Sequence, residues 1–144
     1  MFKVDTKNFK ESEFACRCGG CEYSRNPNMD ERLLMMMEYA RLLAKSVHAS
    51  AYIVIESGRR CIEHNRKVGG ASGSKHLYGL AGDAHFYYKA ADGTRRKFSG
   101  SDLAGVYKSL ADTFPEKYGI ALYERSQFIH IDVDKRCWRD VRNG

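Results

Sequence analysis

The segment SGSKHLYGLAGDAHF, residues 72–86, contains side chains suited to metal chemistry. His76 and Asp83 lie seven positions apart, which on a straight helix is about 10 Å, too far for both to bind one ion at about 2 Å. Gly79 and Gly82 lie between them and permit backbone turns that other residues resist. We therefore expect a loop that folds back and directs both side chains into one pocket.

The segment FIHIDV, residues 128–133, offers a third ligand. With the side-chain period of two of a strand, His130 and Asp132 share a polar face, and the two isoleucines and the valine face the core. Two histidines and one carboxylate are a frequent ligand set of catalytic zinc, which leaves a fourth position for water. His76, Asp83 and His130 are therefore candidate zinc ligands. The alternative is a core histidine with its hydrogen bonds satisfied and an unrelated loop histidine.

Three of the five cysteines lie close together in CRCGGC, as Cys16, Cys18 and Cys21. This C-x-C-x2-C spacing can hold a structural zinc, with Cys61 or Cys137 as the fourth ligand, or form disulfides in an oxidising compartment. Because neither a second C-x2-C pair nor a secretory signal accompanies them, we favour reduced thiols in a loop over a second, structural zinc.

Length and composition indicate a globular protein. With 144 residues, of which 43% are hydrophobic, the chain can bury a core of its own. We therefore expect one domain over residues 1–144, with an irregular cysteine-containing arm at residues 1–28. The N-terminal residues carry charges where a secretory signal has its apolar core, and no apolar run is long enough to span a bilayer. These features predict a soluble monomer that is made in the cytoplasm.

The net charge is +6, from 24 Lys and Arg against 18 Asp and Glu. A positive surface attracts polyanions through long-range fields that salt screens. Nucleic acid, anionic lipid and bacterial cell wall all qualify as partners, and a scattered basic surface without a specific partner is the alternative. Charge alone does not choose among them.

The hydrophobic pattern predicts two long helices. The first, within residues 28–47 and with Asn28 as its N-cap, has apolar residues at helical spacing: Leu33, Met36, Met37, Ala40, Leu43 and Val47. The second, within residues 99–114, ends before Pro115 and has a similar apolar face: Leu103, Val106, Leu110 and Phe114. Both apolar faces are expected to pack against the core.

Strands are predicted at residues 51–57, on both sides of the Asp92–Gly93 turn, and at residues 128–133. A short helix is expected after the first strand, ending at Gly69 and Gly70. Because helices and strands are mixed without a regular βαβ alternation, we predict an α+β fold.

Two longer segments, SGRRCIEHNRKVGGASGSKHLYGLAGDAHF and GIALYERSQFIHIDVD, resemble the zinc peptidases of the hedgehog/DD-peptidase group. That M15A-like group includes D-alanyl-D-alanine carboxypeptidases, D-Ala-D-Ala dipeptidases and the L-alanyl-D-glutamate endopeptidases of phage endolysins. Its pattern is S-G-x-R, then S-x-H-x6-D, then H-x-D or H-x-H. The matching positions here are Ser57, Gly58, Arg60, Ser74, His76, Asp83, His130 and Asp132. The resemblance, which includes EFACRCGG, covers about residues 12–138.

The resemblance implies an antiparallel sheet with helices packed on it and one catalytic Zn2+ bound by His76, Asp83 and His130. It places Arg60 where family members hold an arginine that engages a substrate carboxylate or polarises the scissile carbonyl. It also places Ser74 near the metal, where the hydroxyl can bind substrate or a ligand. The alternatives are a surface salt bridge for Arg60 and a loop-stabilising role for Ser74.

Hydrolysis also needs a carboxylate that takes a proton from water and passes it to the leaving amine. In the related dipeptidases an acid lies three residues before the second histidine, where this chain has Gln127, a neutral amide. Glu124 matches a glutamate at the same offset in hedgehog domains, and we prefer it as the base, with Asp132 as the second candidate. Asp132 can instead orient a ligand histidine, and Glu124 can be a surface residue without a role.

The resemblance predicts a zinc peptidase that cleaves peptidoglycan stem peptides as a carboxypeptidase or an endopeptidase. Without a signal peptide, we expect it to reach the cell wall by release at lysis or within a phage particle. One alternative is a hedgehog-like zinc-containing binding module without turnover. Another is a nucleic-acid binder that uses CRCGGC as a zinc knuckle, but the spacing is unusual and no basic stripe with interleaved aromatic residues accompanies it, so we expect no nucleic-acid partner.

Overall fold

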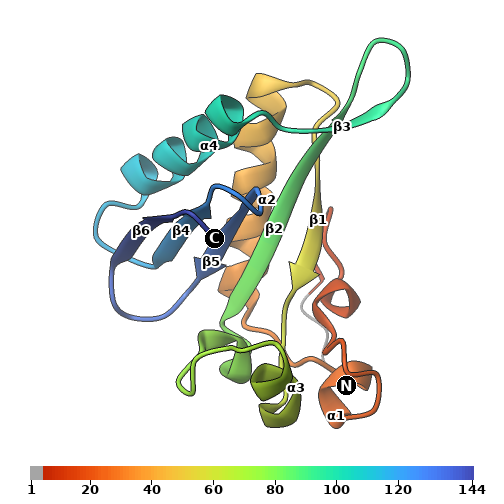
Figure 1. Cartoon of the computed structure of the whole chain (residues 1–144), viewed down its shortest axis with the longest axis vertical. Coiled ribbons are helices and arrows are strands. Elements are labelled where there is room, and N and C mark those ends of the chain that lie inside the picture. The colour runs from red at the N-terminus through yellow and green to blue at the C-terminus, as the bar shows by residue number, and fades with distance from the viewer. Residues whose placement is uncertain (1–4) are drawn as a thin grey trace.

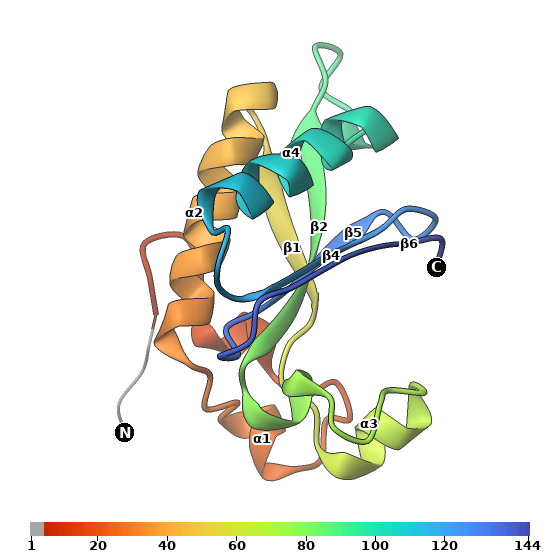
Figure 2. The ribbon, with the colours of Figure 1, turned by 90° about the vertical axis from the view of Figure 1, so that its left-hand side faces the viewer.

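The computed structural model describes residues 5–144 as a six-stranded sheet with two long helices on one face (Figures 1 and 2). The strands are β1 (Tyr52–Ser57), β2 (Ala81–Lys89), β3 (Arg95–Lys97), β4 (Gly119–Tyr123), β5 (Phe128–Asp132) and β6 (Trp138–Arg142). Their order is β1-β2-β5-β4-β6, and β3 pairs with the end of β2 beyond β5. The predicted mixed α+β class is confirmed.

One strand pair departs from the predicted antiparallel sheet. The chain reverses after β5 and passes beyond β4, so β6 runs opposite to β5 and therefore parallel to β4. The other pairs of the sheet are antiparallel. No strand was predicted at β4 or β6.

The helices α2 (Glu31–Val47) and α4 (Gly100–Thr113) contact each other and cover the same face of the sheet (Figure 2). The predicted N-cap of the first helix was wrong. Asp30, not Asn28, accepts a hydrogen bond from the amide of Arg32, because Asn28 has a left-handed backbone with φ of 52°. Neither of these helices, nor any other helix that residues 5–144 form, combines the length and hydropathy that a membrane crossing requires.

The core lies between these helices and the sheet. Leu33 and Met37 of α2 pack with Ile129 and Ile131 of β5, and all four are fully buried. Burial of each such side chain contributes about 1.5–3 kcal/mol to the stability of the fold. The predicted apolar helix face is therefore largely correct, but its last member, Val47, is 42% exposed.

Four short helices gather at one end of the sheet, where β1 ends and β2 begins (Figure 1). They are η1 (Glu11–Phe14), α1 (Glu22–Arg25), α3 (Ile62–Lys67) and η2 (Lys75–Tyr78). Residues 5–28 of the predicted irregular arm contain two of these helices, and residues 1–4 lie outside the described part. α3 ends before Gly69, as predicted, and Gly79 ends η2 in the left-handed conformation with φ of 72°.

Candidate metal centre

Three elements bring the candidate ligands together. His76 lies on η2, Asp83 on β2 and His130 on β5, and Asp83 is paired with His130 in the β2–β5 register. The left-handed turn at Gly79 directs the chain from η2 into β2, so that His76 returns to the same face of the sheet. One ligand atom from each of the three side chains lies within 4.8 Å of the others.

Each imidazole is oriented by a hydrogen bond on its outer nitrogen, the ring nitrogen that faces away from Asp83. Nδ1 of His76 donates to the Gly58 carbonyl at 2.7 Å, which leaves Nε2 facing Oδ1 of Asp83 at 3.4 Å. Nε2 of His130 is 2.9 Å from Oδ2 of Asp132, and Nδ1 is 2.9 Å from the same Asp83 oxygen. Metal-binding histidines in proteins have such partners on the far nitrogen. Two imidazoles and one carboxylate also fit the ligand preference of zinc.

Asp132 is buried beside the ligand set. Its other oxygen, Oδ1, accepts a hydrogen bond from the backbone amide of Asp134 at 3.2 Å. Gly119 is the partner of Asp132 on β4. Because glycine has no side chain, it leaves room for the Asp132 carboxylate, which a Cβ atom at residue 119 would overlap. The strand register therefore holds Asp132 against His130.

The electrostatics of this cluster favour an ion pair when no metal is bound. Burial alone would raise the pKa of Asp83, but the charges of His76 and His130 and their hydrogen bonds outweigh it and hold that pKa well below its usual range. For His130, burial opposes the charged form, yet the hydrogen bonds with Asp132 and Asp83 raise its pKa to about 9. Positive charge is thus stabilised at the centre of the site, as a metal cation requires.

A pocket of about 470 Å³ opens beside the three ligand residues. Its wall includes side chains that the sequence analysis did not identify: Lys75, Tyr123, Arg136, Trp138 and Arg142. The ring of Trp138 is edge-on to His130 at 5.8 Å, and the guanidinium groups of Arg136 and Arg142 lie 5.7 and 5.4 Å from the indole. The alternating sequence WRDVR was the available signal for a strand here.

Comparison with known proteins agrees with this geometry. Residues 7–132, most of the chain, match the family model described as Peptidase M15. The chain belongs to the peptidase M15 family. Peptidases of this family are zinc-dependent, which accords with the two histidines and the aspartate at the centre of the site. No curated protein matches the chain.

In this M15 peptidase, Arg60 lies at the edge of the ligand set. Its guanidinium approaches Oδ2 of Asp83 at 3.6 Å, and it donates to Ser57 Oγ at 3.1 Å and to Asn65 Oδ1 at 3.2 Å. These bonds hold the guanidinium in the pocket wall rather than in a surface salt bridge. Ser74 also lines the pocket, and its hydroxyl accepts a hydrogen bond from the backbone amide of His76 at the start of η2.

The structure does not bring Glu124 to the pocket of this M15 peptidase. Glu124 is exposed in the turn between β4 and β5, where its backbone amide donates to the Arg142 carbonyl. Gln127 ends the same turn with a φ of 57° and does not line the pocket. Of the two carboxylates predicted for proton transfer, only Asp132 lies beside the candidate ligands.

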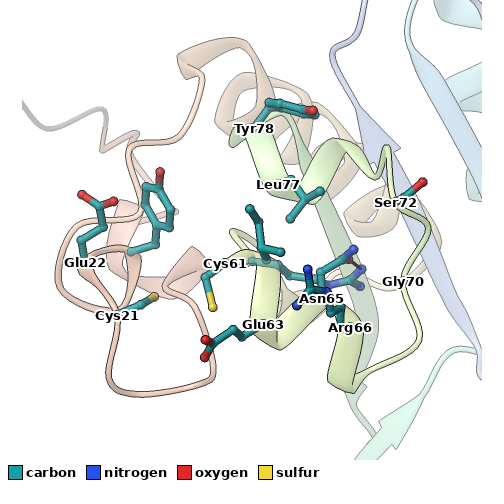
Figure 3. Close-up of a pocket in the computed structure, with 13 residues that line it drawn as sticks. Cys21, Glu22, Cys61, Glu63, Asn65, Arg66, Gly70, Ser72, Leu77 and Tyr78 are labelled. Carbon is teal, nitrogen blue, oxygen red and sulfur yellow. Dashed lines mark hydrogen bonds between the residues drawn. The ribbon is translucent and has the colours of Figure 1, made fainter.

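A second hollow of about 800 Å³ adjoins the first and shares Arg60 and Gly70 with it (Figure 3). It lies between the arm and α3. Acidic and basic side chains both line it, including Glu22, Glu63 and Arg66. Arg60 and Gly70 therefore lie where the two hollows meet.

Proposed function

We propose that this M15 peptidase is a zinc enzyme that hydrolyses a peptide bond in the stem peptides of peptidoglycan. The convergence of His76, Asp83 and His130 in one pocket is the observation that carries the proposal. Each histidine has its outer nitrogen engaged, by Gly58 or by Asp132, and its inner nitrogen directed at the same oxygen of Asp83, Oδ1, so that one cation could bind all three side chains. Because stem peptides lie outside the cytoplasm, the proposed site of action is the cell wall.

We assign zinc binding to His76 Nε2, His130 Nδ1 and the Asp83 carboxylate. When bound, the ion would supply Lewis acidity towards a carbonyl oxygen and would acidify water. Asp132 would keep the His130 ring in the orientation that presents Nδ1 to the ion, and Gly58 would do the same for His76.

The charge of the pocket supports a carboxylate-bearing peptide as the substrate. Four cationic side chains line it, Arg60, Lys75, Arg136 and Arg142, together with the carboxylates of Asp83 and Asp132. Lys75 and Arg136 also pair with Asp134, and Arg142 pairs with Asp140. Stem peptides carry free carboxylates, and a guanidinium binds a carboxylate through two parallel hydrogen bonds. We assign this contact, or the stabilisation of negative charge on the scissile carbonyl oxygen, to Arg60, and substrate hydrogen bonding to Ser74.

Proton transfer is assigned to one of two carboxylates, which a pair of variants distinguishes. Asp132 is beside His130, and Glu124 would have to move inward from its turn to reach the pocket. If Asp132 only orients His130, Asp132→Asn will lower zinc affinity and cleavage together. If Glu124 is the base, Glu124→Gln will abolish cleavage while zinc remains bound.

Mass spectrometry of purified peptidoglycan incubated with the zinc-loaded protein tests the proposed function. We expect new peptide termini with the wild type and none with His130→Ala. His64→Gln is the matched control, because His64 lies on α3 and does not line the pocket of the ligand set. The new termini also identify the bond and so distinguish a carboxypeptidase from an endopeptidase.

One observation favours a second candidate, a zinc-containing binding module without turnover. Among residues 5–144, the only carboxylates that line the pocket are Asp83 and Asp132, and both are bonded to His130. A zinc-loaded wild type that binds peptidoglycan but cleaves no wall chemotype would establish this module in place of the peptidase.

A further inference from the structure

A second cluster of metal-binding side chains lies outside the pocket of the ligand set. Sγ atoms of Cys16, Cys18 and Cys21 in the arm and of Cys61 before α3 all lie within 4.8 Å of one another. The C-x-C-x2-C spacing alone left Cys61 and Cys137 as alternative fourth ligands. The fold decides for Cys61, because Cys137 is exposed beside β6 and its thiol donates to the Pro115 carbonyl.

The spacing of the sulfurs suits a tetrahedral metal ion. Zinc–sulfur bonds of about 2.3 Å at tetrahedral angles place neighbouring sulfurs about 3.8 Å apart. Sγ of Cys18 and Sγ of Cys61 are 3.9 Å apart, although 43 positions separate them along the chain. A disulfide needs a separation of only about 2 Å, and a pair of disulfides does not need all four sulfurs to converge on one point.

Backbone amides are directed at three of the sulfurs. The Gly20 amide donates to Sγ of Cys18 at 3.5 Å, the Cys61 amide to Sγ of Cys16 at 3.4 Å, and the His64 amide to Sγ of Cys61 at 3.4 Å. The Ser24 hydroxyl is 3.5 Å from Cys18 Sγ and 3.6 Å from Cys21 Sγ. Amide donors of this kind stabilise the negative charge of sulfur ligands in metal sites, whereas the Ser24 hydroxyl donates its proton to the Cys16 carbonyl at 2.9 Å.

We propose that Cys16, Cys18, Cys21 and Cys61 bind a structural zinc ion that fastens the arm to the segment between β1 and α3. A four-thiolate set leaves no open position, so the site serves structure rather than catalysis. Figure 3 shows Cys21 on the arm beside Cys61 at the start of α3, and both line the larger hollow. The ion would thereby fix one wall of that hollow.

The segment that this zinc would hold also supports the site formed by His76, Asp83 and His130. The Arg60 amide donates to the His76 carbonyl at 3.0 Å, and the Gly58 carbonyl accepts from the His76 ring. The arm is fixed to the same segment by the Arg59 amide, which donates to the Phe14 carbonyl at 2.8 Å. The proposal does not depend on peptidase activity, because it concerns metal content and structure.

Metal analysis of purified variants tests the proposal. We expect two zinc ions per chain in the wild type, and one in the double variant Cys18→Ser/Cys61→Ser. We also expect one in His76→Ala/His130→Ala. Cys137→Ser is the matched control and should keep two, since Cys137 lies outside the cluster.

X-ray absorption at the zinc edge of His76→Ala/His130→Ala adds a structural measurement. We expect a single shell of four sulfurs at about 2.3 Å. A double histidine variant without zinc, or a shell of nitrogen and oxygen atoms, would overturn the proposal. So would an intact mass of the wild type that shows disulfides among these four cysteines. If the cysteine variant does not fold, the zinc count and the absorption spectrum of the histidine variant decide the question.

Discussion

The two clusters of candidate metal ligands in this M15 peptidase differ in ligand type, support and access. His76, Asp83 and His130 combine two imidazoles with a carboxylate, lie on the sheet and η2, and open onto a pocket of about 470 Å³. The four thiols lie on the arm and at the start of α3, and Cys18 is exposed. Three ligands beside a pocket leave room for substrate, whereas four thiolates enclose an ion.

One short segment of the chain contributes to both clusters in different ways. Within residues 58–61, Gly58 orients the His76 ring, Arg60 approaches Asp83, and Cys61 completes the group of thiols. We therefore expect changes at the histidine cluster to affect chemistry most, and changes at the thiol cluster to affect stability most.

The largest effect is expected for Asp83→Asn. The variant removes the carboxylate that faces both histidines, so cleavage of stem peptides should fall by more than about a hundredfold. That loss exceeds the roughly 10–100-fold effect of removing a residue that only hydrogen-bonds a metal ligand. Peptide release and zinc content measure the change, and the proposed thiol-bound ion should remain. Asp112→Asn, an exposed change on α4, is the control. Full activity of Asp83→Asn would exclude Asp83 as a ligand.

Asp132→Asn should have the next largest effect. Loss of the carboxylate that holds His130 Nε2 is expected to lower zinc affinity at the histidine cluster about 10–100-fold. Cleavage should fall further than zinc occupancy, because Asp132 is the candidate for proton transfer that lies beside the ligands. In metal-free protein, NMR should show His130 titrating near pH 9 in the wild type and at a lower pH in the variant. An unchanged His130 titration would contradict the proposed orienting role.

The metal-free protein should also lose stability between about pH 6.5 and pH 9. The raised pKa of His130 means that its ion pair is fully formed below 6.5, the ordinary value, and is lost as the pH rises through about 9. The loss is on the order of 3 kcal/mol in the free energy of unfolding. Urea unfolding across this range measures it. The lowered pKa values of Asp83 and Asp132 add stability that is lost only as the pH falls below about 4.

Cys61→Ser should reduce stability more than chemistry. A lost zinc cross-link is expected to cost about as much as a lost disulfide, roughly 2–4 kcal/mol. That cost corresponds to a melting temperature lower by about 5–10 °C. Limited proteolysis should then cut the arm faster, while the histidine cluster keeps its zinc. A melting temperature equal to that of Cys137→Ser would argue against the cross-link.

The smallest effect is expected for Glu124→Gln. Because Glu124 is exposed and does not line the pocket, the rate of stem-peptide cleavage should change less than about twofold, as for an ordinary surface substitution. Steady-state cleavage of a defined stem peptide is the measurement. A loss comparable to that of Asp83→Asn would instead assign the base to Glu124 and require the turn to close on substrate.

Local patterns in the sequence were sufficient to predict most of the helices and strands. Alternation predicted that Ile129 and Ile131 face the core and that His130 faces away, and Gly69 and Gly93 marked the end of α3 and the turn between β2 and β3. These features depend on neighbouring residues and on backbone conformation, which the sequence contains directly. The candidate ligands His76, Asp83 and His130 also came from the sequence, through residue type and family resemblance.

Tertiary structure alone decided the contacts between distant segments. The choice of Cys61 over Cys137 depends on how the arm packs against the segment before α3, and the contact between Asp83 and His130 depends on the register of β2 and β5. The position of Trp138 in the pocket wall depends on the pairing of β6 with β4. Residues far apart in the sequence become neighbours only when the whole sheet and its helices pack together. Side-chain periodicity specifies which face a residue occupies, and the global fold specifies what that residue meets there.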